Sequence, residues 1–262
     1  MHSNTGPSAT TNLAPAWLLT GASSGIGWAI ARQLAAQGEA VLAWGRKPEA
    51  LARLQSTTPG VIATQALDLG DEAALREAVE ALLESGRPLK GLIYCAGLQH
   101  DVNLDEASYG PQEMAAELRV NLWAPMALCQ LLLPTLKAQG GARLVLVSSA
   151  LAFVPKRRAA AYSASKAGLH AFCEALRAQL QGSEIELMEL IPPLVDTPMT
   201  AGRSGRKIAP EAVATALSKA LQARRLSTQL WVGPARALPF LLRLAPTRTR
   251  AFFLKASKET PP

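Results

Sequence analysis

The sequence predicts an α/β fold in which a doubly wound parallel sheet lies between two helical layers, giving three layers (α/β/α). Three observations predict it. Short apolar runs alternate along the chain with longer segments of helical periodicity, which is the pattern of strand–helix–strand units. A glycine-rich turn directly follows the first apolar run, at the position where such sheets bind ligands. Apolar residues make up 49% and charged residues 18% of the 262, a composition that suits a globular domain.

The first half of the chain divides into short apolar strands, each followed by a helix. The helix predicted at 25–37 carries Ile26, Ile30 and Leu34 on one face, spaced i, i+4 and i+8, and Gly38 ends it. In chain order the expected elements are strand 16–19, helix 25–37, strand 40–44, helix 49–55, strand 61–67, helix 71–85 and strand 89–95.

The second half continues the pattern with longer helices. Residues 111–139 are strongly helical, and Pro125 is expected to kink this segment or to join two helices, because proline lacks a backbone donor. Pro192 and Pro193 end a strand and open an irregular segment, after which Pro210 suits the first turn of a helix. The remaining expected elements are strand 143–148, helix 160–180, strand 185–191, helix 210–224 and strand 229–232.

No linker rich in glycine or serine divides the chain, so we expect one main domain over residues 15–235. Residues 1–14 are rich in Ser, Thr, Asn, Pro and Gly and lack the basic-then-apolar pattern of a signal peptide, which predicts a flexible tail. Residues 236–262 are expected to form a basic, apolar-striped extension of the same domain. No apolar run reaches the length of a transmembrane helix.

The cysteines and histidines indicate a reducing compartment and no metal site. Cys95, Cys129 and Cys173 show no paired spacing, which is typical of an intracellular protein. None of the three histidines lies at metal-ligand spacing from another. We therefore expect a cytoplasmic protein without a bound metal ion.

The formal net charge of +7 is concentrated near the C-terminus, where residues 192–262 hold twelve Lys and Arg against three acids. Such a region can attract an anionic substrate or lipid, although a solvated basic face is the interpretation we favour. From Pro239 onward, basic residues alternate with Phe and Leu. This pattern suits docking on a membrane surface, but we favour cover for an apolar surface of the same chain or of a sister subunit. Nucleic-acid binding is not expected, because only net charge supports it.

The segment Thr20-Gly21-Ala22-Ser23-Ser24-Gly25-Ile26-Gly27 joins the first strand to the first helix. Its glycines allow a sharp turn and a close approach of the backbone to a phosphate, and the helix N-terminus supplies N–H donors. The segment therefore predicts a site for the pyrophosphate of a dinucleotide, formed by Gly21, Ser23, Ser24, Gly25, Ile26 and Gly27.

The end of the second strand indicates which dinucleotide is bound. A site selective for NAD(H) carries an acid there, about 20 residues after the loop, to bind the adenine ribose. This strand ends in Trp44-Gly45-Arg46-Lys47, so no carboxylate is present. The Arg46 guanidinium suits a 2′-phosphate, which favours NADP(H), with NAD(H) as the alternative.

Tyr162 and Lys166 lie four residues apart, on one face of the predicted helix 160–180. A phenol is a poor base at neutral pH, and a nearby ammonium is expected to lower its pKa and fit it for proton exchange. Ser148 and Ser149 follow the fifth strand, and 13 residues separate Ser149 from Tyr162. The loop between them is long enough to bring both hydroxyls into one pocket.

These motifs together resemble the short-chain dehydrogenase/reductase family. The resemblance is carried by TGASSGIG at 20–27, VNL at 120–122, SS at 148–149 and YSASK at 162–166, in the family's order over residues 16–235. It implies a Rossmann fold and an oxidoreductase that transfers hydride between a nicotinamide cofactor and a carbonyl or alcohol substrate. The segments 96–99, 151–155 and 191–197 look most like the DltE-like branch, which names no substrate.

The resemblance also implies roles for four residues. Tyr162 would be the acid/base, and Lys166 would lower the pKa of Tyr162 and bind the nicotinamide ribose. Ser149 would hydrogen-bond the substrate oxygen. Asn121 would bend its helix and hold the water of a proton relay.

Further cofactor contacts are implied at the ends of other strands. They would be made to the adenine by Asp68 and Leu69, to the adenosine by Ala96 and Gly97, and to the nicotinamide by Pro192, Val195 and Thr197.

Two departures from the family pattern stand out. Tyr94-Cys95 replaces an Asn-Asn pair, which is expected to remove polar pinning at this turn, and Pro193 replaces a glycine.

A dinucleotide-binding regulator with little turnover is the alternative function, favoured slightly by Tyr94-Cys95. The substrate pocket is expected to be mostly apolar, with residues 201–207 as a lid. Helices 111–137 and 160–180 carry apolar side chains on more than one face. Family resemblance implies that they pair across a homodimer or homotetramer. The side chains expected around the substrate are Leu98, Leu151, Phe153, Leu194 and Met199.

Overall fold

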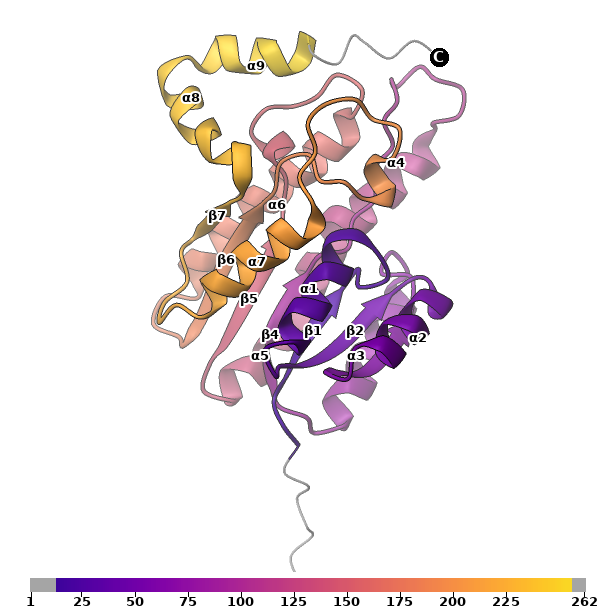
Figure 1. The fold of residues 1–262 in the computed structure, drawn as a ribbon, viewed down its shortest axis with the longest axis vertical. Coiled ribbons are helices and arrows are strands. Elements are labelled where there is room, and N and C mark those ends of the chain that lie inside the picture. The colour runs from indigo at the N-terminus through magenta and orange to yellow at the C-terminus, as the bar shows by residue number, and fades with distance from the viewer. Residues whose placement is uncertain (1–12, 256–262) are drawn as a thin grey trace, which may run out of the picture.

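The computed structural model describes residues 13–255, which form a sheet of seven parallel strands covered by helices on both faces (Figure 1). The strand order is β3-β2-β1-β4-β5-β6-β7, so the predicted doubly wound α/β architecture is confirmed. The strands are β1 Ala16–Thr20, β2 Ala40–Gly45, β3 Val61–Ala66, β4 Leu89–Tyr94, β5 Ala142–Val147, β6 Ile185–Ile191 and β7 Gln229–Trp231.

The order of the strands places a ligand site beside β1. From β1 the chain winds outward to β3, returns to pair β4 with β1, and winds outward again to β7. The carboxyl ends of β1 and β4 therefore lie at the point where the winding reverses, which is where open α/β sheets bind ligands. All five residues of β1 are buried, as expected for a central strand covered on both faces.

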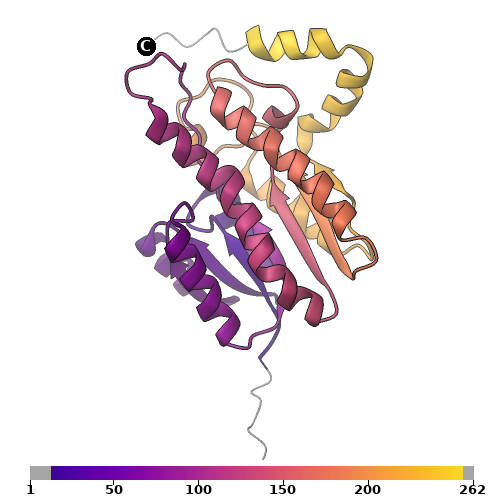
Figure 2. The same cartoon turned by 180° about the vertical axis from the view of Figure 1, so that it is seen from behind.

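Helices α1 (Gly25–Ala35), α2 (Pro48–Thr57) and α7 (Pro210–Leu221) cover one face of the sheet. The other face is covered by α3, α5 and α6, and Figure 2 shows α5 and α6 lying side by side across it. Each layer encloses its own apolar cluster, so both faces of the sheet bury their side chains. The second set of helices comprises α3 Glu72–Glu84, α4 Pro111–Leu118, α5 Ala124–Ala138 and α6 Ala160–Gln179.

Two helices meet near Pro125 in the segment 111–139, which was one of the two expectations for this proline. A π-helical turn over Arg119–Trp123 lies between α4 and α5. Pro125 lies in the first turn of α5. Because the helical backbone continues from the π-helical turn, the missing N–H of Pro125 leaves a carbonyl of that turn without a helical donor.

Residues after β7 form two short helices that the sequence analysis did not assign. A 3₁₀ turn over Gly233–Ala237 leads into α8 (Leu238–Leu244) and α9 (Pro246–Lys255). The expected N-terminal tail lies, up to residue 12, outside the described residues, and so does the end of the C-terminal extension from residue 256. Among residues 13–255, no helix combines the length and apolarity needed to cross a bilayer.

The centre of the sheet depends on Gly91 of β4. A Cβ at this position would overlap the carbonyl oxygen of Arg143 on the paired strand β5. Gly91→Ala is therefore expected to destabilise the fold by at least about 3 kcal/mol. Gly182→Ala, a turn position with φ +80 and nothing within 4 Å of the added Cβ, should cost only about 1 kcal/mol. Urea denaturation midpoints compare the two variants, and equal midpoints would contradict the steric argument.

Candidate active site

The loop between β1 and α1 is held against the end of β4 by close backbone contacts. A Cβ on Gly21, whose φ is +70, would lie 2.7 Å from the Cα and N of Ala96, and a Cβ on Gly27 would overlap the Gly21 carbonyl. Only glycine fits at these two positions. The loop thus presents its backbone, followed by the N-terminus of α1, at the carboxyl edge of the sheet, where a phosphate can be bound.

Buried Thr20 anchors the turn that follows β4. Its Oγ1 accepts hydrogen bonds from the backbone N–H groups of Cys95 and Ala96, at 3.1 and 3.2 Å. Thr20 closes β1, so this pair of bonds fixes the Ala96–Gly97 segment beside the glycine loop. The sequence analysis predicted the loop and the Ala96–Gly97 segment but missed Thr20, whose place just before the first glycine was the available signal.

The loss of polar pinning at the turn after β4 stays a prediction, but Tyr94 makes a polar contact of its own. The Tyr94 hydroxyl donates to the backbone oxygen of Val120 at 2.5 Å, in the π-helical turn, and the side chain is fully buried. Burial raises the pKa of Tyr94 well above its ordinary value, so the phenol keeps its proton and acts as a donor. A tyrosine thus ties β4 to the following helix where the family pattern has asparagine.

Asn121 connects three parts of the site. Its Oδ1 accepts from the backbone N–H of Leu98 at 2.9 Å, and its Nδ2 donates to the Leu98 oxygen at 2.7 Å and to Ser165 Oγ at 3.2 Å. The side chain is completely buried within the π-helical turn. The π-helical turn lies at Asn121, and the residue joins α6 to the loop after β4. Its role in holding a relay water stays a prediction.

Ser149, Tyr162 and Lys166 meet at the carboxyl end of β5. Ser149 lies close enough to the Tyr162 hydroxyl to lower its pKa, and Ser149 Oγ accepts from the backbone N–H of Leu151 at 3.1 Å. Lys166 lies one helical turn after Tyr162, with its Nζ 5.8 Å from the centre of the tyrosine ring and 2.9 Å from the Val147 oxygen, to which it donates. The structure therefore brings together the three residues that the sequence placed in one pocket.

The protonation states at this site differ from the expectation. Burial raises the pKa of Tyr162 to about 12, against smaller lowering effects of the Ser149 hydrogen bond and the charge of Arg203. Burial also lowers the pKa of Lys166 to about 8. The net pKa of Tyr162 is therefore raised and not lowered, because desolvation, which favours the neutral phenol, outweighs any effect of the Lys166 ammonium, which donates to Val147. Tyr162 carries its proton at neutral pH.

The end of β2 leaves a free cation beside the glycine loop. A Cβ on Gly45 would lie 3.2 Å from the Oγ of Ser23, so the strand end and the loop are in close contact. Arg46 follows immediately and is exposed. Within residues 13–255 its guanidinium has no hydrogen-bond or ion-pair partner, so it is available to an anionic ligand.

Asp68 and Leu69 follow β3 and differ in which of their atoms a ligand could reach. Asp68 is exposed, and its Oδ1 accepts from the backbone N–H of Gly70 at 2.8 Å. Leu69 is buried within the apolar cluster on the α3 side of the sheet. Contact of Leu69 with an adenine ring therefore has to come from its backbone.

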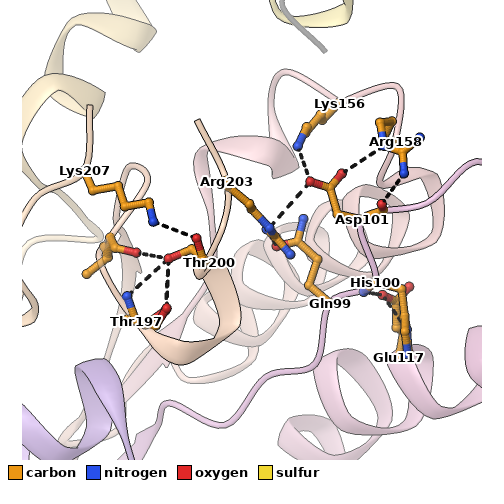
Figure 3. Close-up of polar contacts among 11 residues, drawn as sticks. Gln99, His100, Asp101, Glu117, Lys156, Arg158, Thr197, Thr200, Arg203 and Lys207 are labelled. Atoms are coloured by element: carbon orange, nitrogen blue, oxygen red, sulfur yellow. Dashed lines mark hydrogen bonds and ion pairs between the residues drawn. The ribbon is translucent and has the colours of Figure 1, made fainter. Parts of the chain in front are cut away.

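The segment after β6 folds over the glycine loop. A Cβ on Gly25 would lie 2.8 Å from the Cγ2 of Thr197, so this threonine packs on the start of α1. Thr200 secures the turn by donating from Oγ1 to the Val195 oxygen at 2.5 Å, and Lys207 Nζ donates to the Thr200 oxygen at 2.7 Å (Figure 3). Thr197 thus packs against the loop, and Val195 and Pro192, which precede it, are buried.

A polar cluster that the sequence analysis missed connects the expected lid to the loop after β4 (Figure 3). Arg203 donates from Nη1 to Gln99 Oε1 at 2.5 Å, and its Nε lies 3.5 Å from Asp101 Oδ2. Lys156 Nζ reaches the same carboxylate oxygen at 2.7 Å, and Arg158 donates to the Asp101 backbone oxygen at 2.8 Å. The expected lid, residues 201–207, is therefore tied to the loop after β4 through Arg203, whose charge also acts on Tyr162.

Glu117 is a second residue that the sequence analysis missed. The side chain is 1% exposed and accepts from the Tyr109 hydroxyl at 2.9 Å, with His100 Nδ1 3.2 Å away. His100 also stacks against Tyr109, with ring centres 5.3 Å apart. Glu117 lies one helical turn before Asn121, and that spacing was the available signal.

The expected apolar pocket residues divide into two groups. Phe153 packs against His170 and Trp231, with ring centres 4.5 and 4.7 Å apart, so it is part of the packing between α6 and β7. Met199 is exposed and lies close to Gly97, at the edge of the site.

Comparison with known proteins identifies the relatives of this chain. A family model described as short chain dehydrogenase matches residues 16–207. An uncharacterized oxidoreductase, DltE of Bacillus subtilis, is 35% identical over 69% of this chain and 71% of its own length. Ketoacyl reductase HetN of Nostoc is 31% identical over 78% of this chain and 74% of its own.

A solved structure agrees with these relatives over nearly the whole chain. A short-chain dehydrogenase of Burkholderia cenocepacia in complex with NADP has a TM-score of 0.80 and 26% identity, covering 95% of this chain and 99% of its own. The matched segment contains the glycine loop, Asn121, Ser149, Tyr162 and Lys166 in one continuous stretch. The chain therefore belongs to the short-chain dehydrogenases, and it is an oxidoreductase with the nicotinamide-dinucleotide fold of that family.

Proposed function

We propose that this protein uses NADPH to reduce a carbonyl group to an alcohol, or catalyses the reverse, with Tyr162 as the group that exchanges the proton. One observation carries the proposal. Ser149 and Tyr162 lie close together beside the buried ammonium of Lys166, at the sheet edge that also holds the glycine loop. Two hydroxyl donors at one point are suited to bind and polarise a carbonyl oxygen.

When bound, the nicotinamide ring supplies or accepts the hydride, and the protein supplies position and the proton. Ser149 donates to the substrate oxygen and orients it. Tyr162, protonated because its pKa is about 12, transfers its proton to the oxygen as the alcohol forms. Lys166 stabilises the phenolate that remains, since its ammonium lies 5.8 Å from the ring centre and shares the buried environment.

The backbone and side chains around the glycine loop fit a dinucleotide. The loop and the N-terminus of α1 suit the pyrophosphate, Arg46 suits a 2′-phosphate, and the segment after β6 suits the nicotinamide. Lys166 and Tyr162 would also contact the nicotinamide ribose, and Asn121 would hold the relay water. The other proposed cofactor contacts are Gly21, Ser23, Ser24, Gly25, Ile26, Gly27, Asp68, Leu69, Ala96, Gly97, Pro192, Val195 and Thr197.

A regulator with little turnover was the alternative, and its support came from Tyr94-Cys95. Tyr94 instead bonds the backbone of Val120, and Thr20 holds the turn after β4, which weakens that support. We therefore keep the enzyme as the proposed function, acting in the cytoplasm on a small carbonyl or alcohol.

Among residues 13–255, no three His, Cys, Asp or Glu side chains are grouped to hold a metal ion.

We propose a homodimer or homotetramer that pairs through α5 and α6. The outer surface between α3, α5 and α6 carries a groove of about 600 Å³, and its lining is mostly apolar. Met126, on α5, is 39% exposed beside it. A groove of this kind on paired long helices suits a second copy of the same helices. Further apolar side chains that line it are Trp123, Leu131, Leu133, Pro134 and Phe172.

Replacing the proposed acid/base tests the mechanism directly. Tyr162→Phe removes one hydroxyl and should lower kcat by at least about 1000-fold, while the Kd for NADPH stays within about threefold. Tyr109→Phe is the matched control, because it removes a buried tyrosine hydroxyl bonded to Glu117 and should keep turnover within about tenfold. Stopped-flow turnover and fluorescence titration with NADPH give the two quantities. Turnover retained in Tyr162→Phe would remove the assigned role.

The lowered pKa of Lys166 predicts an alkaline limit of activity. The ammonium is present below its pKa of about 8 and is lost as the pH rises through that value, so kcat/KM for reduction should fall above about pH 8. Tyr162 does not cause this fall, since its pKa of about 12 keeps it protonated. In Lys166→Arg the cation persists, and whatever activity remains should show no such fall. The same alkaline limb in both proteins would contradict the assignment.

Arg46 should determine the preference between the two dinucleotides. Arg46→Glu removes the cation and places an acid where an NAD(H) site has one, so the Kd for NADPH should rise roughly 10–100-fold while the Kd for NADH changes little. Arg32→Glu makes the same charge change at an exposed position in the last turn of α1, the end remote from the loop. Titration of each variant with both cofactors checks the prediction, and an unchanged preference would refute it.

A further inference from the structure

The helix pair α8–α9 concentrates exposed apolar side chains. Five of the ten large apolar side chains that are exposed in the described residues lie on these two helices. Phe240, Leu244 and Phe252 are each about two thirds exposed. A contiguous exposed group of large apolar side chains marks a surface that binds something. The other two are Leu241 and Leu254.

The same helix pair carries positive charge only. Residues 234–255 contain no Asp or Glu, and each of their basic side chains is exposed. No carboxylate within residues 13–255 forms an ion pair with any of them. The cations are therefore available to an external anion. They are Arg236, Arg243, Arg248, Arg250 and Lys255.

The helix pair buries little of this chain's own surface, which was one of the expected roles of the segment. Helix α9 has no buried residue, and α8 reaches the body of the protein through Leu238, its only buried side chain. Thr249 Oγ1 holds the two helices together by donating to the Leu241 oxygen at 3.2 Å. Figures 1 and 2 show both helices standing away from the sheet.

We propose that α8–α9 docks on an anionic lipid surface. Such a surface binds both kinds of side chain that the helices expose, because phosphate groups pair with arginine and the acyl region accepts phenylalanine and leucine. A second copy in a symmetric contact would instead bring two cationic faces together without an acid between them, which opposes pairing. The mixture of exposed Phe and Leu with Arg therefore favours the bilayer over a copy of this chain.

The position of α8 and α9 determines which end of the molecule would face the lipid surface. In both views α8 and α9 lie at the end of the molecule that also holds the lid and the loop between β4 and α4. That loop exposes Leu104, at 61%, as one more apolar contact. If the proposed function holds, the mouth of the site faces the membrane when the helices are docked, so an apolar carbonyl compound carried in the bilayer is the substrate class that the arrangement suits.

Co-sedimentation of the full chain with vesicles tests the docking without any assay of turnover. Vesicles of phosphatidylcholine and phosphatidylglycerol at about 3:1 should bind the protein at about 0.15 M NaCl and release most of it at about 0.5 M. Vesicles of phosphatidylcholine alone should bind at least about tenfold less. Equal binding to the two kinds of vesicle, or to neither, would overturn the proposal.

Two pairs of variants locate the contact. Phe240→Ser/Phe252→Ser and Arg248→Gln/Arg250→Gln should each reduce the bound fraction about tenfold or more. The matched controls should leave binding unchanged. They are Ile62→Ser, an exposed apolar side chain on β3, and Arg224→Gln/Arg225→Gln, an exposed basic pair before β7. Loss of binding in the controls as well, or in neither helix variant, would contradict the assigned surface.

Two further measurements separate docking from its rivals. The helix variants should unfold at the same temperature as the parent chain and reduce a water-soluble carbonyl at the same rate, since neither helix belongs to the proposed catalytic machinery. Failure of the catalytic proposal would leave vesicle binding intact. If Phe240→Ser/Phe252→Ser instead changes the oligomer mass measured by light scattering without lipid, the surface joins two copies and the lipid proposal is wrong.

Discussion

The site is organised around the buried contact between the Lys166 ammonium and the Val147 carbonyl oxygen, 2.9 Å apart. A charged amine that is only 3% exposed is costly unless it donates hydrogen bonds. This contact fixes α6 against the carboxyl end of β5, so the phenol one turn earlier on α6 meets the hydroxyl of Ser149 just after β5. The position of the proposed proton donor is therefore set by where a buried cation finds an acceptor.

Burial of these two side chains also determines their protonation states. Removing water disfavours the phenolate and the ammonium alike, which raises the pKa of Tyr162 and lowers that of Lys166. The tyrosine therefore stays protonated at neutral pH and can act as an acid. The pKa of the lysine falls to about 8, close to neutral pH. Around this pair, Asn121, Tyr94 and Thr20 bind backbone atoms of neighbouring turns, so the polar groups that shape the site are themselves held by the fold.

Sequence reasoning succeeded where the chemistry is local and failed where it depends on how distant loops meet. Tyr162 and Lys166 share a helix face, and the glycine loop follows one strand, so spacing alone predicted both. The contact between Arg203 and Gln99 joins residues 104 positions apart in the sequence, and no periodic pattern predicts such a contact. The pKa of Tyr162 was predicted in the wrong direction because a sequence shows which charge is near but not how much water is removed.

The C-terminal helices illustrate a different difficulty. Pro239 and Pro246 stand where they suggest helix breaks, yet both lie in the first turn of a helix, where proline is well tolerated. Their side-chain pattern is poor evidence for burial, because α9 buries nothing. A helix that leaves Phe252 exposed while the sheet buries its own apolar faces gains its stability elsewhere than in the domain core. Its exposed Phe and Leu beside Arg side chains are the composition that the proposed lipid surface would bind.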